Sequence, residues 1–434
     1  MSFFLKSTLV KNIRLLDVTS GFDEIADVLV STEGFFLNPI EIDAACAIID
    51  GQGQIALPGL IDMHVHFRQP GFEYKETIQT GSKAALVGGV TTVVVMPNTN
   101  PVLDTAERIE EQIRLGHLAN GVEILVAAAV SKNLLGQEPT DYAALKRAGA
   151  VAITDDGRPV MDTSLMEQAM KACAENDLLF MQHAEDLALS QNASMNEGRT
   201  SRAIGVSGQS ADAEGVMVER DIALAKKYGA RYHVLHLSTK RSLQAVRKAK
   251  MEGLKVSCEV APHHLLLNDE ACFALDTNKK MNPPLRDESD RLSLMEGLID
   301  GTIDAVASDH APHSQEEKQA HFCQAPFGVV GLETAFAVLL TLVSRGIISL
   351  QRAAALMTSG PAQILQKQHQ IGTVLSSGAS NNLCIIDLKT LWQVDGQSLQ
   401  GRSKNSAFLG MKLQGKVVAT FLKGNLRYLH DTRI

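Results

Sequence analysis

Residues 58–71 read PGLIDMHVHFRQPG, and this stretch decides the fold. Its centre, 60–67, is a mostly apolar run in which side chains point alternately to the two faces of a β-strand. One face is predicted to carry the polar residues Asp62, His64, His66 and Arg68. The other face is predicted to carry the apolar residues Ile61, Met63, Val65 and Phe67. Two imidazoles on one face can bind one metal ion, although an isolated pair of this kind is more often structural.

Seven further apolar or β-branched runs follow, and helical patterns lie between them. The eight runs are 60–67, 90–96, 123–130, 150–154, 178–183, 231–236, 254–260 and 303–308. Asp104, Asp162 and Ser238 stand where helix N-caps are expected. Strands that alternate with helices predict parallel βαβ units, and eight units predict an α/β fold, a (β/α)8 barrel of the TIM type. A doubly wound open sheet fits less well, since no glycine-rich dinucleotide turn is present.

The chain ends differ from the middle. Residues 1–55 and 370–434 contain short apolar runs separated by Gly, Asn, Asp and Ser turns, such as 383–388, 416–421 and 425–428. They predict a small β-domain built from both termini, which leaves 56–369 for the barrel. The total of 434 residues suits a barrel of roughly 250 to more than 400 residues with additions.

Composition narrows the class of protein. A net charge of -8 gives no basic patch of the kind that nucleic acid requires. No apolar stretch approaches the roughly 20 residues that span a bilayer. The six cysteines are scattered without a CxxC pair, which indicates reduced thiols and a cytoplasmic protein. We therefore expect neither nucleic acid nor a membrane as partner.

Polar residues gather at the ends of seven of the eight runs, and these ends converge on one mouth of a barrel. The third run, which ends at 129–131, contributes almost nothing. The others end in these residues: His64, His66 and Arg68; Asn98; Asp155 and Asp156; His183; His236; His263 and His264; Asp309, His310 and His313. Imidazole with carboxylate suits zinc or a similar divalent ion in an open catalytic site. Spacing alone does not choose between Asp155 and Asp156, and His263, His264 and His310 could support the site or contact it directly.

Nine motifs resemble one family. They are PGLIDMHVHFRQPG (58–71), MPNTNP (96–101), TDDG (154–157), QHAEDLAL (182–189), HLSTK (236–240), APHHLLL (261–267), KMNPPLR (280–286), SDHAPH (308–313) and APFGVVGLET (325–334). In this order they resemble bacterial dihydroorotases of the longer type, within the amidohydrolase superfamily of metal-dependent hydrolase barrels. The resemblance spans nearly the whole predicted barrel.

The resemblance implies roles for individual residues. His64 and His66 would hold one zinc ion, Asp156 would bridge to a second, and His183 and His236 would complete the second site. Asp309 would contact the metal and transfer the proton. Substrate would be bound by His66, Arg68, Asn98, Asn282 and His313 and by the backbone at Phe327 and Gly328. The residues leave open whether one or two Zn²⁺ ions bind per subunit.

The implied reaction is the reversible, zinc-dependent cyclisation of N-carbamoyl-L-aspartate to (S)-dihydroorotate in de novo pyrimidine (UMP) biosynthesis. In the hydrolytic direction, hydroxide on the metal would attack the ring amide carbonyl, with Asp309 as general base and then acid. Arg68 would clasp the substrate carboxylate bidentately. The polar segment 314–324 follows the eighth strand and is either a lid over the mouth or a plain surface loop.

Two alternatives are weighed against this interpretation. Hydantoinases, dihydropyrimidinases and allantoinases act on related rings, but such relatives usually bridge their metals with a carboxylated lysine, and here the fourth strand ends in TDDG. A non-catalytic barrel that partners aspartate carbamoyltransferase is the second alternative, although all six expected metal-site residues are present. A homodimer is also possible.

Overall fold

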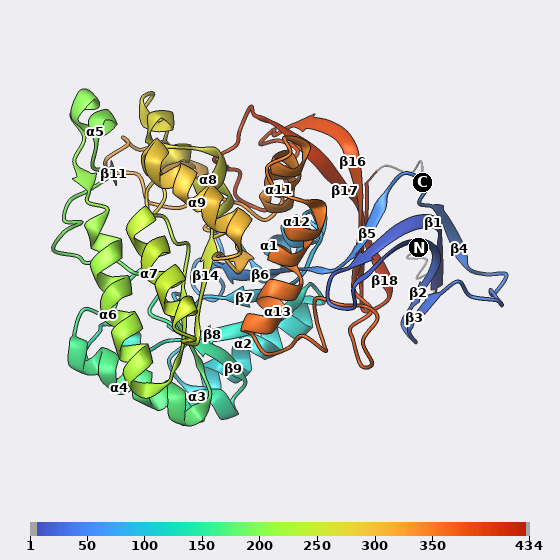
Figure 1. Ribbon diagram of the computed structural model, residues 1–434, viewed down its shortest axis with the longest axis horizontal. Helices are drawn as coiled ribbons and strands as arrows, with labels where there is room; N and C mark the ends of the chain where they lie inside the picture. Colours follow the sequence, from blue (N-terminus) through green and yellow to red (C-terminus); the bar gives the residue numbers. More distant parts are fainter. Residues whose placement is uncertain (1–6, 431–434) are drawn as a thin grey trace.

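The computed structural model describes residues 7–430 and contains a parallel barrel with a second sheet beside it (Figure 1). The barrel strands follow the order β15-β14-β13-β10-β9-β8-β7-β6. Their bounds are β6 Leu60–Val65, β7 Val90–Val95, β8 Glu123–Ala128, β9 Ala150–Ile153, β10 Leu179–Gln182, β13 Arg231–Val234, β14 Val256–Val260 and β15 Ala305–Val306. All eight predicted strands are present, so the predicted α/β barrel is confirmed and the open sheet is not.

The ring closes between its last and first strands. Val65 pairs in parallel with His310, just beyond β15, and His66 N donates to His310 O at 2.8 Å. The backbone N–H of Ser308 also donates to the carboxylate of Asp62 at 3.1 Å. These contacts bring the ends of the first and eighth strands together at the mouth.

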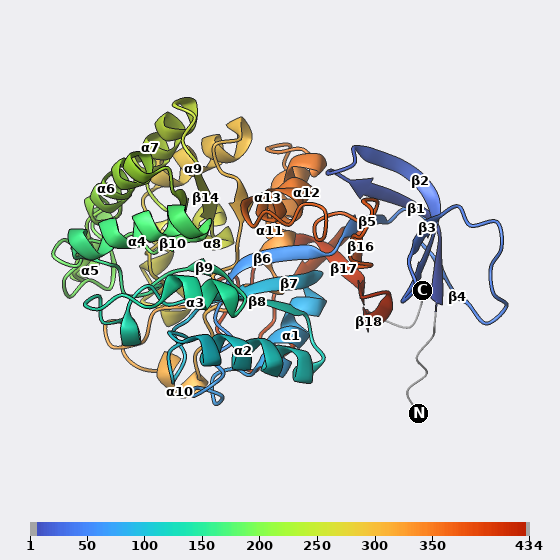
Figure 2. The ribbon, with the colours of Figure 1, turned by 90° about the horizontal axis from the view of Figure 1, so that it is seen from below.

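Helices surround the barrel, as Figures 1 and 2 show. The α-helices are α1 Ile78–Val87, α2 Ala106–Ala119, α3 Tyr142–Arg147, α4 Thr163–Asn176, α5 Arg199–Ile204, α6 Asp212–Tyr228, α7 Lys240–Met251, α8 Pro262–Leu266, α9 Glu288–Asp300, α10 Gln315–Lys318, α11 Ala335–Ser344, α12 Leu350–Met357 and α13 Ser359–Ile364. Short 3-10 turns span Lys132–Leu134, Asp269–Cys272 and Thr277–Lys279, and two short strands, β11 Met195–Asn196 and β12 Gly208–Gln209, pair with each other. No helix within 7–430 has the length and apolar character needed to cross a membrane.

One of the three N-cap residues predicted from the sequence caps its helix in the structure. Asp162 caps α4, as predicted. Helix α2 is capped by Thr105 instead of Asp104, whose carboxylate pairs with an arginine one turn further on. Helix α7 is capped by Thr239 instead of Ser238, because the Ser238 hydroxyl donates to the buried carboxylate of Glu214.

Strand β6 departs from strict alternation. Ile61 and Met63 pack in a cluster with residues of β7, β8, β9, β10 and β15, whereas Val65 and Phe67 pack in the cluster that includes residues of the surrounding helices. The prediction of one shared apolar face is therefore wrong. The cause is a shift in the pairing register of β6 with β7, which changes the side that each later residue faces. After the shift His64 points into the barrel.

The second sheet joins strands from both ends of the chain, in the order β18-β17-β16-β5-β1-β2-β3, with β4 also paired to β1 (Figure 1). Its strands are β1 Ser7–Asp17, β2 Phe22–Ser31, β3 Phe35–Leu37, β4 Ala47–Asp50, β5 Ile55–Pro58, β16 Leu383–Gln393, β17 Lys412–Leu422 and β18 Asn425–Leu429. The sheet has its own core, which includes Val28, Ile385 and Phe421. The domain limits at 55/56 and 369/370 stay a prediction, and β5 spans the first of them.

Candidate metal centre and active site

Two groups of possible metal ligands share one carboxylate at the mouth of the barrel. The first group is His64, His66 and Asp156, and the second is Asp156, His183 and His236; all are buried. Asp156 Oδ2 lies 3.4 Å from His66 Nε2, and Asp156 Oδ1 lies 3.4 Å from His64 Nε2. On the other side Asp156 Oδ1 lies 3.6 Å from His183 Nδ1 and 3.7 Å from His236 Nε2. Five of the six residues predicted to hold metal thus face one another.

Asp155 and Asp156 point in opposite directions. The carboxylate of Asp155 accepts hydrogen bonds from the backbone N–H groups of Val130 and Ser131, at 2.8 and 3.1 Å, and so ties β9 to the end of β8. Burial is the main reason why the pKa of Asp155 is raised to about 6. The sequence left the choice between Asp155 and Asp156 open. In the structure Asp156 lies among the histidines and Asp155 does not.

Asp309 completes the cluster. Its Oδ1 lies 3.4 Å from His66 Nε2 and 3.7 Å from His64 Nε2. Burial opposes ionisation of this carboxyl, but the surrounding histidines outweigh it and hold its pKa well below the ordinary value. Asp309, His236 and Arg68 all have positive φ, at 46°, 30° and 60°. Such backbone strain in non-glycine residues is concentrated at functional sites.

Each of three histidines uses its second ring nitrogen in a further hydrogen bond. His66 Nδ1 lies 2.8 Å from Asn98 Oδ1. His183 Nε2 lies 2.9 Å from Glu185 Oε2, and His64 Nδ1 lies 2.9 Å from Glu259 Oε1. Sequence reasoning missed both glutamates. The signal was present in Glu259, because it is a charged residue within an otherwise buried, mostly apolar strand.

Arg68 and Asn98, both predicted to bind substrate, line a cavity of about 240 Å³ together with Asp156. Arg68 Nε donates to Pro312 O at 3.2 Å. Burial lowers the pKa of Arg68 to about 10, so its guanidinium stays positively charged at neutral pH. A fixed cation therefore stands beside the shared carboxylate of the two metal-ligand groups.

Of the remaining predicted substrate-binding residues, His313 lies beside the first cavity, since its Nε2 is 3.5 Å from Arg68 Nη2. Asn282 and Phe327 line a second cavity of about 270 Å³, and Asn282 Nδ2 donates to Glu185 Oε2 at 2.7 Å. His313 Nε2 lies 2.7 Å from Phe327 O. Gly328 O accepts from Asn405 Nδ2 at 3.1 Å, and this asparagine was not predicted. Arg68 and Asn98 thus line one cavity and Asn282 and Phe327 another, and His313 lies between Arg68 and Phe327.

Lys75 and Glu76 follow the first barrel strand and are well buried: Glu76 fully and Lys75 mostly. Lys75 Nζ lies 3.2 Å from His313 Nδ1 and 2.9 Å from Glu317 Oε1. The segment 314–324 contains α10 and is held to the barrel through this lysine, which also lines the cavity beside Arg68.

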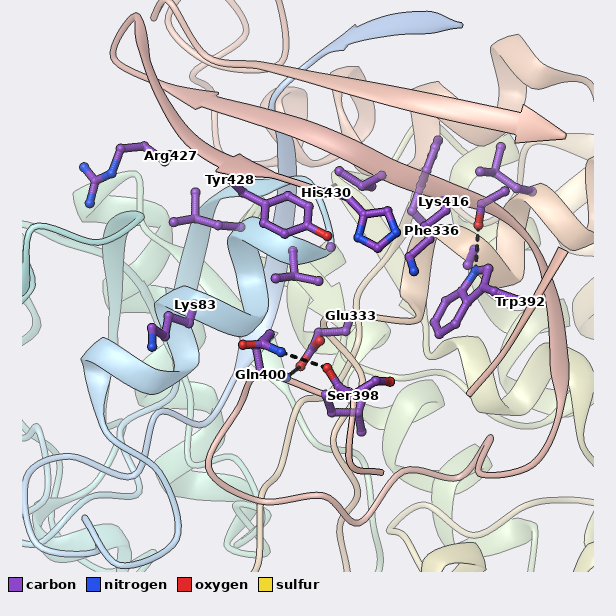
Figure 3. Close-up of a pocket in the computed structure, with 18 residues that line it drawn as sticks. Lys83, Glu333, Phe336, Trp392, Ser398, Gln400, Lys416, Arg427, Tyr428 and His430 are labelled. Atoms are coloured by element: carbon purple, nitrogen blue, oxygen red, sulfur yellow. Dashed lines mark hydrogen bonds between the residues drawn. The ribbon is translucent and has the colours of Figure 1, made fainter. Parts of the chain in front are cut away.

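Another cavity, of about 500 Å³, lies between α1, α11 and the strands β17 and β18, away from the histidine cluster at the mouth of the barrel. Figure 3 shows its cationic side chains spread around the edge, and Arg427 donates to Asn120 outside it. It contains none of the predicted site residues. Although larger, it offers no group of ligands for a metal, so the chemistry belongs to the histidine cluster.

The donor set fits a divalent metal. His64 Nε2 and Asp156 Oδ1 are buried and have no hydrogen-bond partner within the described chain. Buried polar atoms are otherwise almost always paired, and a cation between these two would satisfy both. Neutral imidazoles and ionised carboxylates are the ligands that zinc and similar ions take in open catalytic sites.

The barrel and this cluster define the class, a (β/α)8 amidohydrolase whose mouth can hold metal ions. Residues 53–242 match the family model described as dihydro-orotase-like. The dihydroorotase of Halalkalibacterium halodurans is 44% identical over 423 residues, 96% of this chain and 97% of that protein. The dihydroorotase of Bacillus subtilis is 43% identical over 424 residues, 97% of this chain and 98% of that protein. The chain belongs to the dihydroorotase family and is a cyclic amide hydrolase.

Solved structures support the fold independently. The L-hydantoinase (dihydropyrimidinase) from Arthrobacter aurescens superposes with a TM-score of 0.86 at 25% identity, covering 98% of this chain and 97% of that one. The dihydropyrimidinase from Brevibacillus agri superposes with a TM-score of 0.82 at 21% identity, covering 98% and 95%. The second likeness bears on the fold alone.

Proposed function

We propose that this chain is a dihydroorotase that interconverts N-carbamoyl-L-aspartate and (S)-dihydroorotate in pyrimidine biosynthesis. The observation that carries the proposal is the position of Arg68 and Asn98 in one small cavity with Asp156, the carboxylate that both ligand groups share. Full-length relatives that are 43–44% identical and named dihydroorotase support the same substrate.

The metal is proposed to be Zn²⁺, held by His64, His66 and Asp309 with Asp156, and, where a second ion binds, by Asp156 with His183 and His236. When bound, zinc would lower the pKa of a water molecule toward 7 and polarise the amide carbonyl. Asp156 belongs to both ligand groups, so it would serve as a ligand in either site, which supports a centre that can hold up to two ions.

Substrate orientation falls to Arg68 and Asn98. A guanidinium offers two parallel N–H donors that match a carboxylate, and (S)-dihydroorotate carries one carboxylate on its ring. Because Arg68 donates its Nε to the carbonyl of Pro312, its direction is fixed before substrate arrives. Asn282, His313 and the backbone at Phe327 and Gly328 are proposed to contact the substrate from the opposite side.

Asp309 is proposed to move the proton. In hydrolysis, water adds to the ring carbonyl carbon while Asp309 accepts a proton from that water. The carbon–nitrogen bond of the ring then breaks, Asp309 returns the proton to the departing nitrogen, and the carbonyl carbon ends as a carboxyl group that releases its remaining proton to solvent. Cyclisation is the reverse, with loss of water. His66, whose Nε2 lies 3.4 Å away, orients the carboxylate.

Hydantoin and dihydropyrimidine rings are the competing substrates, since the solved neighbours carry those names. These unsubstituted rings lack a carboxylate, and a mostly buried arginine in their site would have no partner. A site that leaves a charge unpaired binds such ligands poorly. We therefore expect turnover of dihydroorotate and little turnover of the uncharged rings.

The test uses the purified full chain alone. Metal is stripped with a chelator and restored with Zn²⁺, and metal content and dihydroorotate hydrolysis are measured together, with hydantoin and dihydrouracil as comparison substrates. We expect activity on dihydroorotate that disappears with the metal. A folded, metal-loaded chain that leaves dihydroorotate unchanged would contradict the proposed substrate.

Some finer predictions stay open to separate measurements. A homodimer, assembly with aspartate carbamoyltransferase and a cytoplasmic location are proposals, and size-exclusion chromatography with and without that enzyme checks the first two. The segment 314–324 is proposed as a lid. Limited proteolysis with and without substrate checks it, and equal cleavage rates would reject it.

A further inference from the structure

Glu259 is a carboxylate with no access to solvent in the interior of the barrel. It lies on β14, between Cys258 and Val260, which pack outward against the helices. Its relative exposure is 0%. A buried charge costs several kcal/mol unless other groups compensate it. Specific neighbouring groups must therefore compensate the charge of this carboxylate.

Two histidines bind the two oxygens of Glu259. His64 Nδ1 lies 2.9 Å from Oε1, and His233 Nε2 lies 3.2 Å from Oε2. His233 is also fully buried, and its Nδ1 lies 2.8 Å from the hydroxyl oxygen of Ser257, its neighbour across the β13–β14 pair. These four residues form one chain of hydrogen bonds through the barrel.

The chemistry of these groups decides which atom donates in each hydrogen bond. A carboxylate only accepts hydrogen bonds, so both histidines donate to Glu259: His64 through Nδ1–H and His233 through Nε2–H. The Ser257 hydroxyl donates to the remaining nitrogen of His233. When His64 is neutral, as a metal ligand must be, this arrangement leaves the proton on Nδ1 and the lone pair on Nε2, the atom that faces Asp156 and has no hydrogen-bond partner among residues 7–430.

We propose that Glu259 is a positioning residue of the metal centre, which fixes the tautomer and ring direction of His64, and that His233 holds Glu259 in turn. The inference rests on the proposed function, since it concerns the same cluster. A carboxylate behind a metal-binding histidine also makes the imidazole a better ligand, and loss of such a partner typically costs about 10- to 100-fold in metal affinity.

Two substitutions separate shape from charge. Glu259→Gln keeps the volume, and its amide oxygen can still accept from His64 if the amide nitrogen faces His233. His233 can then adopt its other tautomer and donate to Ser257. Glu259→Leu leaves the Nδ1–H of His64 without an acceptor. We therefore expect Gln to weaken metal binding less than Leu.

The matched control is Asp221→Asn. Asp221 is another carboxyl with 0% exposure on the barrel, held by Tyr232 and Arg220 and outside the histidine cluster. The Asp221→Asn variant therefore shows how the removal of a buried carboxylate outside the cluster affects folding stability. Unfolding of the metal-free proteins, measured alongside, shows that each variant is folded.

The experiment measures Zn²⁺ affinity of the full chain by competition with a chelator. Relative to wild type we expect a loss of about 10-fold in Glu259→Gln, about 100-fold in Glu259→Leu and no loss in Asp221→Asn. Turnover of Glu259→Gln should recover at saturating Zn²⁺. Nitrogen and proton NMR of histidine-labelled, Zn²⁺-loaded protein should show an Nδ1–H signal shifted downfield by the hydrogen bond to Glu259, and this shift should be lost in Glu259→Leu.

Folded Glu259 variants that hold Zn²⁺ as tightly as wild type would overturn the inference while leaving the proposed function intact. Failure of the wild-type cluster to hold Zn²⁺ would overturn the proposed function itself. The two failures are therefore distinguishable in one titration.

Discussion

The two sides of the mouth are built differently. The proposed metal ligands come from the ends of barrel strands, and their second ring nitrogens are held by partners such as the buried Glu259 and the half-buried Asn98. Of the proposed substrate contacts, Asn282, His313, Phe327 and Gly328 lie in loops away from these strand ends. Those loops are held by lysines: Lys318 Nζ donates to the carbonyls of Pro326 and Gly328, at 3.1 and 3.0 Å.

This difference separates two tasks. A metal needs ligands fixed to within a few tenths of an ångström, and neighbouring strands of one barrel supply that rigidity. A substrate must enter and leave, and loops tied by a few hydrogen bonds to carbonyls permit movement. Changes to the metal ligands should therefore lower turnover or metal binding, and changes to the substrate contacts should raise KM.

The largest effect is expected for Asp309→Asn. The amide cannot accept the proton, so kcat should fall by about 10²- to 10⁴-fold, the usual contribution of a general acid–base group. Asp304→Asn is the control, because Asp304 precedes the same strand at its opposite end and pairs with Lys250. Steady-state kinetics with metal content measured on each sample decides the point. Near-normal turnover of a metal-loaded Asp309→Asn variant would assign the proton to another group.

Arg68→Lys should act mainly on KM. A hydrogen bond to a charged group contributes about 1.5–3 kcal/mol, so loss of the bidentate geometry should raise KM by about 10- to 100-fold with a smaller change in kcat. Arg158→Lys is the comparison, because Arg158 lines the same cavity but is exposed. Equal effects of the two variants would show that only positive charge near the cavity matters.

The strand side is also the part that sequence predicts best. The parallel strands of a barrel all end at one mouth. A His-x-His pair at one strand end therefore converges with the single His or Asp residues at the other strand ends. That argument brought His64, His66, His183 and His236 together without a structure. It could not choose between Asp155 and Asp156, because neighbouring residues on a strand point to opposite sides.

The loop side was accessible only through resemblance to a family. Asn282 and Gly328 follow no periodic pattern, and nothing in their local sequence places them near Arg68. Glu259 and Glu185 were missed for another reason: their roles depend on hydrogen bonds to histidines, which Glu259 makes across the barrel and Glu185 makes two residues along the chain. The register shift in β6 was missed as well, since a single extra residue in a strand leaves no mark in composition.

Gly328→Ala tests the loop side directly. Gly328 has φ of 125°, and an added Cβ would lie 2.8 Å from both Cβ and O of Ala311. Strain of this kind costs about 1–3 kcal/mol, so the loop should shift and KM should rise several-fold. Gly346→Ala is the control, since Gly346 also has positive φ (70°) but nothing lies within 4 Å of the added atom. Kinetics and thermal unfolding are measured on both variants. Both variants introduce strain from positive φ, so an effect seen only in Gly328→Ala comes from the contact with Ala311.

The smallest effect concerns Lys318 and pH. Burial, reinforced by Lys280, lowers the pKa of Lys318 to about 7, while Asp276 and Glu317 oppose the shift. In the unfolded chain its pKa returns to about 10.4, so between these values the unfolded state binds more protons than the folded state. Stability contributed by this site should therefore rise with pH from about 7 to about 10, and not fall. The free energy of unfolding of wild type minus that of Lys318→Met, measured across this range, should increase. A difference that is flat or decreasing would mean that the carbonyls of Pro326 and Gly328 keep Lys318 charged, and that the loop is held as firmly as the strand side.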